Sequence, residues 1–201
     1  EILAGANTPE AGRVFLDGRE ITRSRPAERR RLGLGYVPTD RFQRGSVLDA
    51  SVAENLIVLE REQLDRLGFV DRAQVRTYAR QLIEQFAINA RPEAQLSELS
   101  GGNAQKVVLS REIARLPRAL VVCEPSWGLD LESKRLVYDA LRALAASGSA
   151  VLVLTTELDE VFEIADRVAI LQAGRITLEK PITETSVSEI ASVETGAGGR
   201  Q

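Results

Sequence analysis

Residues 99–106, with the sequence LSGGNAQK, place the strongest constraint on how this chain folds. Ser100 and two glycines open a segment whose apolar residues recur at helical spacing, namely Val108, Leu109, Ile113 and Leu116. A serine at a helix start accepts a hydrogen bond from a first-turn amide, and glycines let a ligand approach the backbone. The unpaired amides and the positive end of the helix dipole suit an anion, most naturally a phosphate. An ordinary capped surface helix has the same local pattern, and it is the commoner case for Ser-Gly-Gly alone.

The neighbouring segments favour the phosphate interpretation. An apolar run at residues 119–123 leads into Glu-Pro and then Gly-Leu-Asp, and a second run at 151–155 leads into Thr-Glu-Leu-Asp-Glu. Together with YVPTDR at 36–41, their order and spacing resemble the ATP-binding domain of an ABC transporter. Residues 99–106 resemble the family signature, the first run the Walker B strand and D-loop, and the second run the switch strand. The resemblance extends from residue 1 to about residue 180.

The resemblance implies an α/β fold, the ABC-type sandwich of the P-loop NTPases. It combines a mostly parallel sheet and helices with an antiparallel β part and a helical subdomain that carries the signature. We expect one partial domain over residues 1–201, with the helical subdomain at about 42–116 and a flexible tail at about 186–201. The runs at 119–123 and 151–155 read as buried parallel strands.

Local signals place several smaller elements. Residues 13–21 read as a β-hairpin around Asp-Gly. Ser51 and Glu54 form the pattern of a capping box, and Asp71 is an N-cap for the helix that follows it. Asp130 is an N-cap for a helix over residues 131–146. We expect the helices between residues 42 and 96 to bury one face, and the family resemblance makes them the docking site for a membrane subunit.

Composition agrees with one cytoplasmic domain. The chain has 201 residues, 44% of them hydrophobic, which is enough for one good core. Its net charge of -3 gives no basic footprint for nucleic acid. A single cysteine and no signal-like start favour the cytoplasm, and no apolar run is long enough to span a membrane. We therefore expect a peripheral protein at the cytoplasmic face of the membrane, attached through a partner.

The 201 residues contain no G-x-x-x-x-G-K-[ST] loop, the Walker A motif that holds nucleotide phosphates and Mg²⁺ in this family. We expect an N-terminally truncated chain, because EILAGAN at residues 1–7 is typical of a helix end with a glycine stop. A diverged protein without a P-loop is the alternative. In either case we expect these residues alone neither to bind ATP tightly nor to hydrolyse it.

Three positions depart from the family pattern. Thr39, Cys123 and Thr156 stand where the family usually has Gln, Asp and His, and the chain has no histidine. A threonine is shorter than glutamine and cannot replace an imidazole, and a thiol is a soft ligand whereas Mg²⁺ prefers oxygen. We read Cys123 as a small buried apolar residue and assign no metal ligand. The second ATP-binding half of tandem sugar and nucleoside importers often lacks the Gln and the His, so these departures also mark a subfamily.

The resemblance assigns a role to each candidate site residue. Glu124 would be the catalytic base that polarises the attacking water, provided that metal and γ-phosphate lie beside it. The signature would contact the γ-phosphate of ATP on a facing domain, and Asp130 would cross the interface between the two domains. The nucleotide-binding set is Ser100, Gly101, Gly102, Asn103, Thr39, Asp130 and Thr156.

The functional prediction is the ATP-binding component of an ABC importer for simple sugars or nucleosides, with ATP and Mg²⁺ as cofactors. This chain would be a degenerate half, whose signature completes the ATP site of a second ATP-binding domain in a head-to-tail dimer. Membrane permease subunits would be the other partners. Two alternatives remain: a non-transport ABC-type regulatory ATPase or repair factor, and an interaction module with no nucleotide role.

Overall fold

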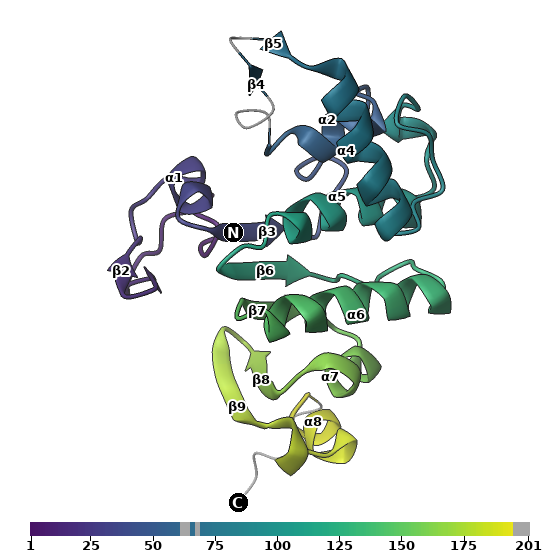
Figure 1. Ribbon diagram of the computed structural model, residues 1–201. Helices are drawn as coiled ribbons and strands as arrows, with labels where there is room; N and C mark the ends of the chain where they lie inside the picture. Colours follow the sequence, from purple (N-terminus) through teal and green to yellow (C-terminus); the bar gives the residue numbers. More distant parts are fainter. Residues whose placement is uncertain (61–64, 67–68, 195–201) are drawn as a thin grey trace, which may run out of the picture. The chain divides into compact units, whose positions relative to one another are not determined.

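The computed structural model describes residues 1–60, 65–66 and 69–194 of the chain. It divides into two compact units, residues 1–154 and 155–201 (Figure 1), where the sequence predicts one partial domain.

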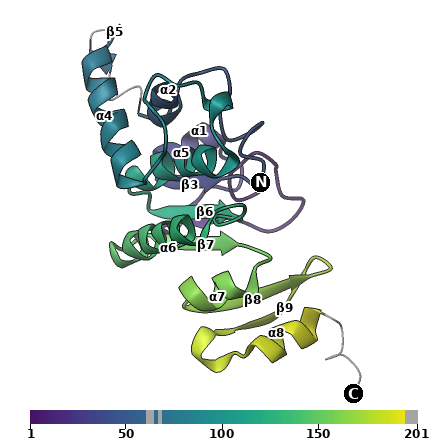
Figure 2. The same ribbon diagram turned by 90° about the vertical axis from the view of Figure 1, so that its right-hand side faces the viewer.

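A three-stranded parallel sheet lies at the centre of the first unit, in the order β3 (Leu34–Val37), β6 (Ala119–Cys123), β7 (Ala150–Leu154). Val37 pairs with Val122, and Cys123 pairs with Leu154. Figure 2 shows the three strands side by side, with α6 (Leu131–Ala146) against β7. Because β3 and β6 are parallel neighbours, the residues that follow them emerge at one edge of the sheet.

The sheet strands differ in burial. The middle strand β6 is buried as predicted, with Leu120 and Val122 fully covered. The predicted strand at 151–155 forms as β7, but the expectation that it is buried is wrong: Leu152 is 47% exposed and Leu154 is 42% exposed. Among the described residues of this unit, β7 pairs with β6 alone, so one of its edges has no neighbouring strand.

Capped helices form the predicted helical part, which comprises α2 (Val52–Ile57), α4 (Arg72–Gln85), the short 3-10 helix η1 (Leu96–Glu98) and α5 (Gly101–Ala114). The capping box of α2 is confirmed, since the Glu54 amide donates to Ser51 Oγ at 3.2 Å and Ser51 N donates to the Glu54 carboxylate at 2.8 Å. Asp71 caps α4 as predicted, accepting from the Ala73 amide at 2.8 Å. A two-stranded β-ribbon, β4 (Asp65–Arg66) with β5 (Phe69–Val70), precedes α4.

The signature helix α5 is buried on all sides rather than along one stripe. Every residue from Ala104 to Ile113 is buried, so the chain packs around this helix. Leu116, which the helical spacing placed on the apolar stripe, is 69% exposed. It lies beyond the last helical residue and has a positive φ of 47°, so it points out of the helical register.

The buried charges of α5 have partners. Glu112, 1% exposed, accepts from Arg30 Nη1 at 2.9 and 3.0 Å and from the Tyr36 amide at 3.3 Å, which links α5 to β3. Lys106 donates to the Ala87 carbonyl at 2.6 Å. Such partners are required, since an uncompensated buried charge costs several kcal/mol.

The N-terminal part carries the predicted hairpin, β1 (Phe15–Leu16) with β2 (Arg19–Glu20), followed by α1 (Pro26–Arg31). Asp17 and Gly18 at its turn have φ values of 48° and 76°, as a type I′ turn requires. Arg29 of α1 is 1% exposed and anchors the first residues of the chain. Its guanidinium donates to the backbone carbonyls of Ile2, Leu3, Thr22 and Ser24.

The second unit contains α7 (Leu158–Ile164), the antiparallel pair β8 (Arg167–Gln172) and β9 (Arg175–Pro181), η2 (Ile182–Glu184) and α8 (Val187–Glu194). Its core consists of Val168, Ile170 and Ile190. Within residues 186–201, where the sequence predicts a flexible tail, Val187–Glu194 is helical and Ile190 packs with Val168 and Ile170 of β8. Residues 195–201 lie outside the described part of the chain.

Across the described ranges, no helix has both the length and the apolar character needed to cross a bilayer.

Candidate functional site

The start of α5 is exposed, as a site for an incoming phosphate requires. Ser100 is the N-cap, and both Ser100 and Gly101 are exposed to solvent. Ser100 Oγ accepts from the Asn103 amide at 3.4 Å and from Asn103 Nδ2 at 3.0 Å. The first amides of an α-helix have no partner within the helix, so this start presents donors at its positive end.

Asn103 is turned toward its own chain. Its Oδ1 accepts from the Asn89 amide at 2.8 Å, while its Nδ2 donates to Ser100. The side chain thus holds the N-cap and ties it to the segment after α4. In this arrangement Asn103 orients Ser100 and is engaged within the chain.

The segment between β6 and α6 packs against the second signature glycine. A Cβ atom built on Gly102 would lie 3.2 Å from Leu129 Cδ2 and 3.6 Å from the Gly128 carbonyl oxygen. A larger side chain at this position would require Leu129 to shift, so Gly102 suits the close approach of this segment. The structure thereby brings the predicted signature and the predicted D-loop together within one unit.

Asp130 ends this segment and caps α6, as the sequence predicts. Its carboxylate accepts from the Ser133 amide at 2.8 Å and from Ser133 Oγ at 3.0 Å. These hydrogen bonds hold the pKa of Asp130 below its ordinary value. The carboxylate therefore remains charged at the exposed start of a second helix, beside the first.

Glu124 follows β6 and has a left-handed backbone conformation. Its φ is 47°, which costs a non-glycine residue about 1–2 kcal/mol. Its amide donates to the Leu154 carbonyl at 2.8 Å, and Gln105 Nε2 donates to its carbonyl at 3.0 Å and also to the Pro125 carbonyl. Gln105 is 1% exposed and comes from the signature helix. Nothing in its sequence position points to this contact, so sequence reasoning missed it.

Three further predicted residues, Thr39, Cys123 and Thr156, follow or end strands of the chain. Thr39 is exposed after β3, and its carbonyl accepts from the Arg41 amide at 3.2 Å. Cys123 is half-buried at the end of β6, where we expected a buried residue. Thr156 belongs to the second unit and is exposed there.

The donor set offers little to a metal ion. Within the ranges that the structure describes, no three acidic or cysteine side chains converge as metal ligands. Cys123 supplies a soft thiol at the strand end, whereas Mg²⁺ selects hard oxygen ligands. The described residues at the strand ends therefore do not fit Mg²⁺.

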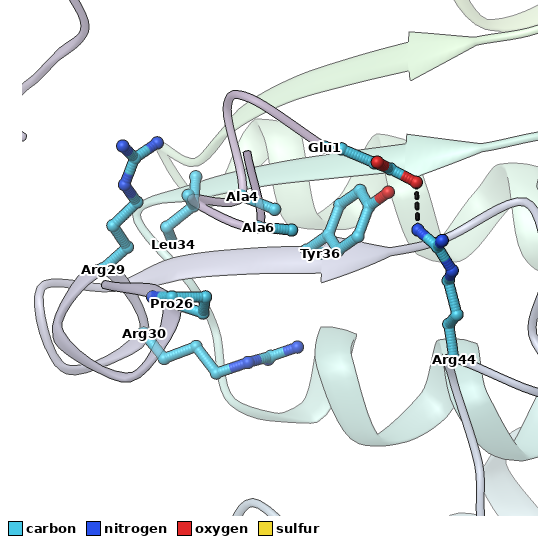
Figure 3. Close-up of a pocket in the computed structure, with 9 residues that line it drawn as sticks. All are labelled: Glu1, Ala4, Ala6, Pro26, Arg29, Arg30, Leu34, Tyr36 and Arg44. Atoms are coloured by element: carbon cyan, nitrogen blue, oxygen red, sulfur yellow. Dashed lines mark hydrogen bonds and ion pairs between the residues drawn. The ribbon is translucent and has the colours of Figure 1, made fainter. Parts of the chain in front are cut away.

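A small cavity of about 190 Å³ lies between the first residues, α1 and β3 (Figure 3). Its cations have partners already, since Arg44 pairs with Glu1, Arg30 pairs with Glu112 and Arg29 donates to backbone carbonyls. Ligand pockets usually measure about 300–1,000 Å³. Small and with its charges paired, this cavity is a poor candidate for a nucleotide.

Comparison with known families agrees with the arrangement of α5, β6 and their connections. A family model described as "ABC transporter" matches residues 1–126. The chain belongs to the ABC transporter family. The predicted ABC-type α/β fold is confirmed by solved cassettes, to which this family member is similar. An ATP-binding cassette solved as a dimer in a post-hydrolysis state with ADP and Pi has a TM-score of 0.77 at 19% identity, covering 90% of this chain and 78% of that one. A nucleotide-free cassette from an ABC transporter has a TM-score of 0.74 at 22% identity, covering 96% and 77%.

Named relatives of this ABC transporter chain include import proteins. The ribose import ATP-binding protein RbsA of Chromobacterium violaceum is 40% identical over 174 residues, which cover 86% of this chain and 35% of that protein. The nucleoside import ATP-binding protein NupA of Lactococcus lactis subsp. cremoris is 35% identical over 177 residues, covering 87% and 35%. The chain thus spans about a third of the length of these relatives.

Proposed function

We propose that this chain is part of the ATP-binding component of an importer for simple sugars or nucleosides. Its α5 start would contact the terminal phosphate of ATP held by a second ATP-binding domain. One observation carries this proposal: Ser100 and Gly101 are exposed at the start of a buried helix of 14 residues. Because α5 is buried from Ala104 to Ile113, its start is held in place, as recognition of a phosphate requires. The names of the import relatives support the transported class.

The chain's own nucleotide side would be degenerate. Thr39, Cys123 and Thr156 replace groups that gather around metal, water and γ-phosphate in the family. If each replacement cost about 2 kcal/mol and the effects added, the rate would fall by more than about 10⁴-fold. Glu124 would then make little difference to turnover, although its backbone is well fixed.

A surface beside α2 and α4 supports a membrane subunit as the further partner, at the cytoplasmic face of the membrane. An open groove of about 530 Å³ lies there, lined by Val47, Ala50, Ile57, Val58 and Val75 with Glu54, Asn55 and Arg72 at its polar positions. Val47 is 56% exposed and Val58 is 47% exposed. Exposed apolar side chains grouped in a groove are typical of a docking surface.

The test pairs this chain with an ATP-binding domain from the same organism that carries a complete Walker A loop. We expect ATP-dependent association of the two, measured by analytical ultracentrifugation. The Gly101→Asp variant should abolish it, because its carboxylate repels phosphate. The same charge favours the helix, since it lies at the positive end of the dipole, so loss of folding is not expected.

The Gly101→Ala variant is the matched control. A Cβ atom on Gly101 would meet Phe42 Cζ at 3.9 Å, an ordinary contact, so alanine fits without displacement. This variant should retain most of the association. Equal association of the Gly101→Asp chain and the unmodified chain would refute the proposal.

A further inference from the structure

Arg41 has an environment unlike that of the other buried arginines. It is 8% exposed, and its guanidinium carbon lies 5.6 Å from the centroid of the Phe42 ring and 5.5 Å from that of the Trp127 ring. Its buried Nε has no hydrogen-bond partner in the described part of the chain, nor does any described carboxylate form an ion pair with it. Burial lowers its pKa, although an arginine remains charged near neutral pH.

Two other buried arginines of the first unit, Arg29 and Arg111, have different surroundings from Arg41. Arg29 and Arg111 are as deeply buried, at 1% and 6% exposed, yet the terminal nitrogens of each donate to backbone carbonyls. Arg111 Nε also has no partner in the described part of the chain, so the difference lies in these terminal nitrogens. Those two guanidinium groups are held by the fold that they stabilise. The described part of the chain shows no hydrogen bond from the Arg41 guanidinium, so two ring faces and the charge of the neighbouring Asp40 offset only part of its desolvation. A buried donor without a partner in its own chain indicates a partner from outside.

The position of Arg41 indicates where that partner binds. Its Nη2 lies 3.9 Å from a Cβ atom built on Gly128, and the Gly128 carbonyl oxygen lies 3.6 Å from one built on Gly102. The Phe42 ring reaches Gly101 in the same way, at 3.9 Å. Trp127 is 61% exposed and Phe42 is 37% exposed. The Arg41 side chain therefore lies beside the start of α5, covered by two rings that solvent reaches.

We propose that Arg41 is an anion-binding residue that donates to the phosphate group bound at the start of α5. The proposal rests on the proposed function, to which it adds a specific cationic contact. A buried guanidinium that lies over two rings is already oriented, so it loses little freedom when it binds, and its planar donors suit phosphate oxygens. A phosphate also accepts from the amides of the helix start, and we favour it over a carboxylate because its several oxygens can reach both sets of donors.

Trp127 is the sole tryptophan of the chain and contacts Arg41, so its fluorescence reports on this position. We expect tripolyphosphate, titrated into the 201-residue chain, to change this fluorescence saturably. Sodium acetate at equal ionic strength should have no such effect. The Arg41→Gln variant should bind tripolyphosphate at least about tenfold more weakly. The Arg44→Gln variant is the matched control, since Arg44 is exposed and paired with Glu1, and it should bind as the unmodified chain does.

A melting experiment separates a binding role from a structural one. The Arg41→Met variant keeps a side chain of similar length between the rings and removes the charge. Its Tm without ligand should equal or exceed that of the unmodified chain, whereas the increase in Tm with tripolyphosphate should disappear. A lowered Tm with unchanged affinity for tripolyphosphate would show that Arg41 is structural and overturn the proposal. Equal effects of acetate and tripolyphosphate would also overturn it.

The association assay distinguishes this proposal from the proposed function. If the Arg41→Gln chain pairs with the second domain at the same ATP concentration as the unmodified chain, the role of Arg41 is refuted and the proposed function stands. A different result would be that the unmodified chain binds tripolyphosphate but does not pair with the second domain, while the Arg41→Gln chain no longer binds tripolyphosphate. The phosphate contact of Arg41 then stands and the proposed function fails.

Discussion

The start of α5 and the carboxyl ends of β3 and β6 lie in the same unit but are supported by different kinds of contact. At the start of α5, side chains fix the backbone: Asn103 orients Ser100, and Leu129 packs against Gly102. At the strand ends, hydrogen bonds fix the amide and the carbonyl of Glu124, while Thr39 is exposed.

This difference indicates which surface of the chain is organised for binding. Recognition of a ligand requires side chains and amides that are fixed before the ligand arrives. The start of α5 meets that requirement, and Arg41 adds a cation to it. The strand ends combine a threonine, a half-buried thiol and a glutamate, which are a poor set for metal and phosphate. The difference favours a chain that acts on nucleotide held by another domain.

The largest expected effect comes from the ion pair that joins α5 to the sheet. The Arg30→Ala variant leaves Glu112 buried with the Tyr36 amide as its remaining donor. We expect the free energy of unfolding in urea to fall by about 2–3 kcal/mol, below the range for a fully buried pair because Arg30 is partly exposed. Arg118→Ala is the control, since Arg118 and Asp17 form an exposed pair whose loss should cost less than about 1 kcal/mol. Equal losses of unfolding free energy in the two variants would contradict the view that α5 is held more firmly than the rest of the unit.

The next effect tests the contact that joins the two regions. Gln105→Leu removes the hydrogen bonds to the Glu124 and Pro125 carbonyls while keeping an apolar side chain in place. We expect the free energy of unfolding to fall by about 1–2 kcal/mol, because the buried Pro125 carbonyl loses its side-chain donor. The Glu124 carbonyl keeps the Trp127 amide as a donor at 3.3 Å. Hydrogen exchange at the Glu124 amide should accelerate, while that of the Asn103 amide changes little. Faster exchange at both the Glu124 and the Asn103 amide would show that the strand ends and the start of α5 open together, as one cooperative unit.

Local signals were enough to predict the elements that carry the site. The caps at Ser51, Asp71 and Asp130 depend on residues two or three positions apart, so the sequence reveals them directly. The turn at Asp17 and Gly18 is equally local. The central strand β6 is recognisable as the apolar run at residues 119–123.

Contacts between distant residues were not accessible in the same way. The exposure of Leu152 depends on which strands pair with β7, and the burial of α5 depends on packing from all sides. Gln105 and Arg41 acquire their positions beside Glu124 and Trp127 through folding, across 19 residues in the first case. Single-sequence periodicity carries no information about such pairs, and both lie at the candidate site.

A smaller effect is expected from Glu124 at the strand ends, for which the comparison predicts a weak role in ATP turnover. In the paired assay with the second ATP-binding domain, the Glu124→Gln variant should change ATP turnover by less than about twofold. The reason is that hydrolysis would take place at the partner's nucleotide, and the substitution keeps the size of the side chain. The control is the equivalent substitution of the partner's own catalytic glutamate, which should abolish turnover. Loss of most turnover with Glu124→Gln would show that the strand-end region is competent.

The smallest effect concerns the pH dependence of the Asp130 cap, next to the start of α5. Hydrogen bonds from Ser133 lower the pKa of Asp130 below its ordinary value of 3.8. The unfolded chain therefore binds this proton more readily, so the cap contributes stability above pH 3.8 and loses it as the pH falls through the lower, folded pKa. The Ser133→Ala variant keeps the hydrogen bond from the backbone amide to Asp130 and removes the one from the hydroxyl. The pKa of Asp130 should therefore rise toward 3.8. Urea unfolding from pH 7 to pH 2.5 should then show a shallower acid loss than in the unmodified chain, and the carboxyl titration of Asp130 by NMR should shift upward. Superimposable curves for the two chains would show that the Ser133 hydroxyl does not orient the Asp130 carboxylate. Asp130 would then not belong to the set of fixed side chains around the start of α5.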